Sequence, residues 1–159
     1  MTDLYEPQAE FLTWVMSGDA SLVGSSFAET NLRRVLALMH DEHTANRDWA
    51  TFILAHEEID NKEVRDALLA AAKDSDPIVR GEALVGLALR DKELALPLVK
   101  RELEGKEWGS PTFEAAELIA HSSLLDGLRR LAGSANTDWA NEEIAQAISA
   151  CEADFAANK

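Results

Sequence analysis

The sequence predicts an all-α protein: a right-handed α-solenoid of about four stacked helix pairs with a divergent N-terminal cap helix. The first observation is a weak internal repeat of about 33 residues, in which residues 47–55 align with 80–88 and a third copy follows at 114–120. Repeats of this length are typical of helix pairs stacked in a row. The second is composition, because 47% hydrophobic residues with only 6% aromatics, four prolines and eight glycines favour closely packed helices. The third is that no strand-like alternation of useful length appears.

Local signals predict where the helices begin. Asp60 can cap a helix, with Glu63 completing a capping box. Asp76 is a second N-cap because Pro77 follows it at the first helical position, and Ser110-Pro111 repeats that start. We expect nine helices, at residues 7–17, 26–39, 45–56, 61–73, 77–89, 92–104, 111–121, 122–132 and 138–155.

One segment carries a family resemblance. The run Asp74-x-Asp76-Pro77-x-Val79-Arg80-x-Glu82-Ala83-Leu84-x-Gly86-Leu87-Ala88 resembles the HEAT-like repeats, which are short antiparallel helix pairs stacked into an α-solenoid. The resemblance implies that Arg80 and a loop aspartate such as Asp74 tie adjacent repeats together. It also implies a single domain over residues 1–159, in which 41–121 are the best-matching repeats, 1–40 form an N-terminal cap and first helix, and 122–159 form a C-terminal cap.

The charge balance excludes some partners. Lys and Arg total 15 against 29 Asp and Glu, which gives a net charge of -14 and a pI near 4.6. Residues 1–32 contain five acids and no base, and residues 131–159 contain five acids and only Lys159. A nucleic-acid or membrane surface needs a basic face, so neither is an expected partner. An acidic surface attracts basic proteins, although acidity also simply keeps a protein in solution.

No motif indicates a metal, another cofactor or catalysis, and we expect a protein that is not an enzyme. HEAT-repeat deoxyhypusine hydroxylases bind two irons with four His-Glu pairs, whereas His56-Glu57-Glu58 provides one pair. The run His40-Asp41-Glu42-His43 is too short for ligands to converge on zinc, and is better explained as a turn between repeats. Cys151 lies in an apolar stripe, as expected for a small core residue.

Trp49 and Trp139 are the best candidates for partner contact. Each falls in the first turn of the second helix of a repeat, and in HEAT-like stacks those helices line the concave face. Asp48 and Asp138 precede them, where an acid favours the helix dipole. HEAT-like DNA glycosylases also use Trp and Asp, but on a basic face. The alternative is that each Trp packs between repeats and each Asp serves only as a cap.

Two further residues, Glu82 and Trp108, complete the predicted partner-binding set. Glu82 lies in the HEAT-like segment, and Trp108 lies in an irregular loop that could leave it exposed. Trp14, in Phe11-Leu12-x-Trp14-Val15, is instead expected in the core of the N-terminal cap.

These features favour a non-enzymatic, cytoplasmic binder of a basic protein. A single cysteine fits a reducing compartment, and the acidic N-terminus does not resemble a secretory signal. A short acidic solenoid would suit neutralising a basic protein, as immunity proteins do for toxin domains. The alternatives are a HEAT-like lyase of the kind that attaches bilins to proteins, and a scaffold for several basic peptides. The sequence leaves the oligomeric state open.

Overall fold

A computed structural model describes residues 5–135 and 137–157. Over these residues the chain forms nine α-helices and one 3-10 turn, with no strand, which confirms the predicted all-α class. The helices are α1 (Glu10–Ser17), α2 (Ala28–Leu38), α3 (Thr44–His56), α4 (Lys62–Ala71), α5 (Pro77–Arg90), α6 (Lys92–Glu104), α7 (Pro111–Ile119), α8 (Leu125–Leu131) and α9 (Asp138–Ala157), and the turn is η1 (Ser122–Leu124).

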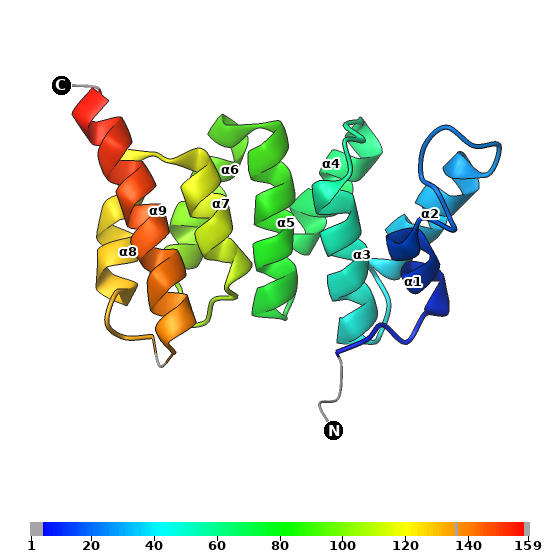
Figure 1. The fold of residues 1–159 in the computed structure, drawn as a ribbon, viewed down its shortest axis with the longest axis horizontal. Helices are drawn as coiled ribbons and strands as arrows, with labels where there is room; N and C mark the ends of the chain where they lie inside the picture. The colour runs from blue at the N-terminus through cyan, green and yellow to red at the C-terminus, as the bar shows by residue number, and fades with distance from the viewer. Residues whose placement is uncertain (1–4, 136, 158–159) are drawn as a thin grey trace.

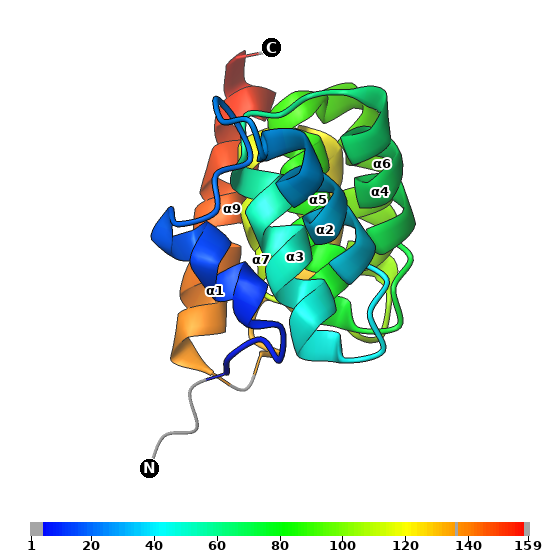
Figure 2. The same ribbon diagram turned by 90° about the vertical axis from the view of Figure 1, so that its right-hand side faces the viewer.

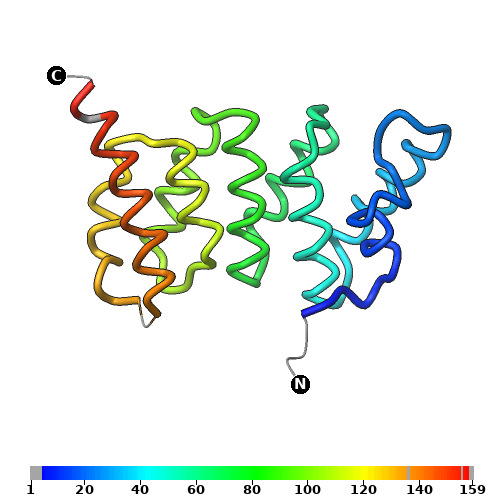
Figure 3. Tube along the Cα trace, in the orientation of Figure 1, coloured from blue at the N-terminus to red at the C-terminus, as the bar shows by residue number. Residues whose placement is uncertain are grey.

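The helices stack as pairs in two layers. Helices α3, α5, α7 and α9 pack one against the next, and α4 and α6 pack behind α5 and α7 (Figure 1). Figure 2 shows α2, α4 and α6 on one side of this row, and α1 on the other side, where it contacts α3. The trace in Figure 3 runs from α1 and α2 at one end of the stack to α8 and α9 at the other. We call the side of α3, α5, α7 and α9 that faces away from α2, α4, α6 and α8 the inner face.

Two of the predicted helix starts are correct and one is wrong. The Asp76 carboxylate accepts hydrogen bonds from the N–H groups of Ile78 and Val79 at 2.8 and 3.3 Å, and Pro77 begins α5. Pro111 likewise begins α7. Asp60 is not the N-cap of α4: the neighbouring Asn61 accepts from the Val64 N–H at 2.9 Å.

Arginines join each repeat to the next. Arg47 of α3 donates from Nε and Nη2 to the two carboxylate oxygens of Asp74, at 2.8 and 3.1 Å. One repeat later, Arg80 donates from Nε to Glu102 at 2.8 Å. Both arginines also donate from Nη1 to the carbonyl of the turn aspartate before their own helix, Asp41 and Asp74, at 3.0 Å. Asp74 therefore does tie repeats together, with Arg47 as its carboxylate partner, while Arg80 reaches its main chain.

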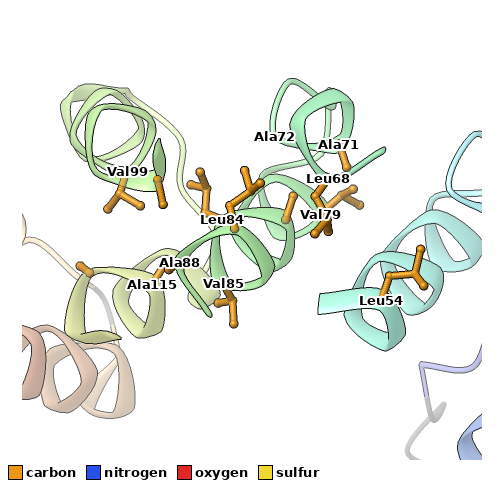
Figure 4. Close-up of a cluster of buried hydrophobic side chains, with 14 of the residues drawn as sticks. Leu54, Leu68, Ala71, Ala72, Val79, Leu84, Val85, Ala88, Val99 and Ala115 are labelled. Carbon is orange, nitrogen blue, oxygen red and sulfur yellow. The ribbon is translucent and has the colours of Figure 1, made fainter. Parts of the chain in front are cut away.

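The core lies between the two layers. Figure 4 shows Leu84 and Ala88 of α5 among side chains of α4, α6 and α7 such as Leu68, Val99 and Ala115. Cys151 of α9 is fully buried as expected, and burial raises the pKa of its thiol to about 11.

The N-terminal cap differs from the expectation in one residue. Phe11 and Leu12 are buried, but Trp14 is 44% exposed, so the prediction that it belongs to the core is wrong. The short helix α1 buries Phe11 and Leu12 and leaves the Trp14 side chain only partly covered.

Candidate functional site

Most of the arginines are occupied away from the inner face. Beyond the Arg47 and Arg80 pairs, Arg65 of α4 binds Asp60 at 2.6 Å and Asp91 at 3.5 Å. Arg90 donates to main-chain carbonyls of the α3–α4 junction, those of Leu54, Ala55, Glu57 and Ile59, at 2.7–3.2 Å. These cations stabilise the solenoid itself.

A line of carboxylates crosses the row of inner helices, one from each. We call Asp48 of α3, Glu82 of α5, Glu114 of α7 and Glu143 of α9 the acidic strip. Within the described part of the chain, none of the four forms an ion pair.

Neighbouring acids of the strip act on one another electrostatically. Burial, together with the charges of Asp48 and Glu114, raises the pKa of Glu82 to about 8. Burial and the charge of Glu114 also raise the pKa of Glu143. One oxygen each of Glu82 and Glu143 is buried without a hydrogen-bond partner among the described residues. A buried polar atom without a hydrogen-bond partner is costly, so these two carboxyl groups are unsatisfied among the described residues.

A cavity of about 300 Å³ opens at one end of the strip, between α1, α3 and α5. It is lined by Tyr5, Met16, Asp48, Trp49, Phe52 and Glu82. The Trp49 indole Nε1 donates to the Tyr5 carbonyl at 3.3 Å, and the Tyr5 hydroxyl donates to the Asp48 carboxylate. Burial raises the pKa of Asp48 to about 6, against the effect of the Tyr5 hydrogen bond. Burial and the Asp48 charge raise the pKa of Tyr5 to about 12.

The predicted contact residues do not all gather at this cavity. Asp48, Trp49 and Glu82 line it, and Trp49 is half-buried. Asp138 and Trp139 lie exposed at the start of α9, with Trp139 53% exposed, two inner helices beyond Glu82. Trp108 does lie in a loop, between α6 and α7, but it is half-buried with its ring 4.8 Å from that of Phe113. A partner-binding role for these residues stays a prediction.

Sequence reasoning missed Glu114 and Glu143. Glu114 follows Glu82 at an offset of 32, the repeat spacing already found between the second and third copies. Carrying Glu82 forward by 32 residues would have found Glu114. Glu143 lies in the poorly matching C-terminal part, where no alignment of repeats points to it.

The histidines take ordinary structural positions. His43 Nδ1 lies 3.0 Å from Asp41 in the turn before α3, and the His56 ring packs 4.5 Å from that of Phe52. Within residues 5–135 and 137–157, no three His, Cys, Asp or Glu side chains are placed to hold a metal ion. In the same ranges, no helix combines the length and the apolar composition needed to cross a membrane.

Comparison with known proteins agrees with this architecture. The family described as HEAT repeats matches residues 32–120, more than half of the chain. The chain belongs to the HEAT-repeat family. Solenoids of this family generally bind other proteins, so the fold is consistent with a protein-interaction scaffold.

The chain is also similar to the Escherichia coli protein YibA, both in sequence and in structure. YibA of strain K12 is 29% identical over 91 residues, which are 57% of this HEAT-repeat chain and 32% of YibA, and YibA of O157:H7 gives the same values. The X-ray structure of YibA superposes with a TM-score of 0.58 at 22% identity, covering 90% of this chain and 54% of that one. The chain thus matches only about a third of the sequence, and about half of the solved structure, of this relative.

Proposed function

We propose that this HEAT-repeat protein is a non-enzymatic binder whose inner face takes up a basic segment of a partner protein. The observation that carries the proposal is the acidic strip: Asp48, Glu82, Glu114 and Glu143 follow one another across four helices without an ion pair among the described residues. Several arginines are bound elsewhere in the fold, so no cation among the described residues neutralises the strip. A Lys- or Arg-rich segment would supply the missing donors.

In its more specific form, the proposal is that this protein is cytoplasmic and neutralises a basic partner protein. The protein would hold its acidic strip in the cationic cleft of a basic protein, one copy to one, as immunity proteins do for toxin domains. The charge of -14 supports this because long-range attraction speeds association with a basic partner. A lyase for bilin attachment is the alternative; Cys151, whose thiol is fully buried and has a raised pKa, would not serve it as a nucleophile.

The test is affinity capture from the source cell with two variants, each of which replaces three carboxyl groups. One carries Glu82, Glu114 and Glu143 replaced by Gln on the inner face. The other carries Glu63, Glu93 and Glu104 replaced by Gln, three exposed acids of α4 and α6. Each variant replaces three carboxyl groups by amides, so a difference between the two reports the position of the carboxyl groups and not their number.

We expect one basic protein, retained at about equal stoichiometry by the wild type and the α4/α6 variant and lost by the inner-face variant. Several weak, salt-sensitive basic partners with the same variant dependence would support the scaffold form of the proposal. Equal retention by both variants would overturn it, as would purification with a pigment and no protein partner.

A further inference from the structure

We infer that the cavity between α1, α3 and α5 is a pocket for one cationic side chain, a lysine or an arginine of the bound partner. This inference rests on the proposed function and deepens it, because it assigns one subsite of the inner face to one chemical group. The cavity of about 300 Å³ has room for a single long side chain. Its lining combines aromatic and apolar walls with two carboxylates.

The carboxylates provide the charge complementarity. Asp48 comes from α3 and Glu82 from α5, and the charge of Asp48 acts on Glu82. One Glu82 oxygen is buried with no donor among the described residues, and no ion pair there neutralises either acid. Arg47, whose charge reaches Tyr5, is itself bound by Asp74. An ammonium or guanidinium group between the two carboxylates would donate to both.

The remaining walls fit the rest of such a side chain. Trp49, Phe52 and Tyr5 supply aromatic surface, and Met16 supplies a flexible thioether. A cation over an aromatic face is attracted by the ring, and the methylene stem of Lys or Arg packs on apolar surface while its head stays polar. A neutral apolar side chain would leave both carboxylates unsatisfied, and an acidic one would be repelled.

The probes are small and defined. n-Butylammonium reproduces the lysine head and stem, n-propylguanidinium reproduces arginine, and 1-butanol is the neutral control. The readout is the Trp49 indole N–H signal in a ¹H–¹⁵N spectrum of the whole protein, assigned by Trp49→Phe. This signal is sensitive because the N–H donates to Tyr5 at the cavity wall.

We expect one or both cations to shift the Trp49 signal with saturation, and 1-butanol to shift it far less. Whichever cation binds more tightly identifies the preferred side chain. Glu82→Gln should weaken that binding at least about fivefold, as loss of a charge-assisted hydrogen bond does. Glu93→Gln, an exposed acid on α6, should leave it unchanged, and Phe52→Leu should weaken it while keeping an apolar wall.

Three results would overturn the inference: no saturable shift with either cation, equal shifts with 1-butanol, or unchanged binding in Glu82→Gln. The proposed function is tested separately, by measuring the binding of a lysine- and arginine-rich peptide. Peptide binding that depends on Glu114 and Glu143 but not on Glu82 or Phe52 would contradict the pocket and support the proposed function. Saturable cation binding without peptide binding would support the pocket and contradict the proposed function.

Discussion

At the scale of single residues, the proposed binding needs an ionised Glu82, whereas ionising this side chain destabilises the free protein. Its pKa of about 8 means that the folded protein holds this proton more tightly than the unfolded chain does. A carboxyl with a raised folded pKa makes the fold most stable below its ordinary pKa, and that stability is lost as the pH rises through the folded value. The same sign applies to Asp48, whose pKa is raised to about 6.

Glu82→Gln should therefore stabilise the free protein in alkaline solution. We expect the free energy of unfolding at pH 9 to rise by about 2 kcal/mol, less than the full pKa shift implies because the side chain keeps some contact with water. Urea unfolding at pH 5, 7 and 9 measures it, and the gain should shrink toward pH 5. Glu63→Gln, on an exposed surface, serves as control. An equal gain at all three pH values would contradict a charge-based cause.

The same residues show what the sequence could reveal about the site. Asp48 and Trp49 were predicted from their place near the start of the second helix of a repeat, and Glu82 from its place in the HEAT-like segment. The unpaired state of Glu82 could not be predicted. It depends on the arginines one repeat away, whose carboxylate and carbonyl partners are fixed only by the packing.

At the scale of helices, the approach of α3 to α5 depends on Gly86. A Cβ at this position would lie 2.8 Å from the Cα of Ala55 and 3.1 Å from a methyl of Leu68. Backbone cannot move out of the way as a flexible side chain can. Glycine is normally unfavourable inside a helix, so here close packing of two inner helices outweighs helix propensity.

Gly86→Ala should destabilise the protein by about 1–3 kcal/mol, the usual cost of overpacking, although Ala is the better helix former. Thermal unfolding followed by circular dichroism measures it. Gly127→Ala in α8 is the comparison, since its Cβ would meet only side-chain atoms of Leu103, at 3.1 Å and beyond. A gain in stability for Gly86→Ala would show that α3 and α5 lie further apart than described.

Arg90 at the end of α5 closes the C-terminal end of α3. It supplies donors to the carbonyls of Leu54, Ala55, Glu57 and Ile59, which have no further turn of helix to bond. Burial lowers the pKa of the guanidinium, as expected for a cation held by neutral carbonyls.

Arg90→Met keeps the aliphatic stem but removes these donors, and should cost about 3 kcal/mol of unfolding free energy. Hydrogen exchange would locate the effect. We expect faster exchange in residues 54–60 with little change in α7 and α9. Uniform loss of protection over all helices would contradict a local capping role.

The starts of α5 and α7 were predictable because they are marked chemically, by Asp76-Pro77 and by Pro111. The error at α4 arose because Asp60 and Asn61 can both cap, and only the fold shows that Arg65 takes up Asp60. The error at Trp14 arose because apolar spacing identifies a helix face but not whether a neighbour covers it. At Trp14 the helix α1 is only partly covered.

At the scale of the whole molecule, the paired arginines and the acidic strip occupy different places. Cations such as Arg47, Arg80 and Arg65 lie in ion pairs between or behind the inner helices, and the acidic strip stays unpaired among the described residues. A net charge of -14 leaves the free protein with considerable self-repulsion. Salt should then act in opposite directions on folding and on binding.

Raising NaCl from 50 to 500 mM should raise the melting temperature of the free protein, because screening relieves repulsion between like charges. The affinity for a lysine- and arginine-rich peptide should fall about tenfold over the same range. Differential scanning calorimetry and isothermal titration calorimetry in matched buffers measure the two effects. Salt-independent peptide binding would contradict recognition by charge.

The most direct measurement is a pH titration of the Glu82 side-chain carboxyl, by NMR of ¹³C-labelled protein with and without saturating basic peptide. We predict a pKa of about 8 in the free protein and a clearly lower value in the complex, because a bound cation favours the ionised form. A free-state pKa near that of an ordinary glutamate would contradict the buried, unneutralised strip. A raised pKa that the peptide leaves unchanged would contradict its role in binding a basic partner.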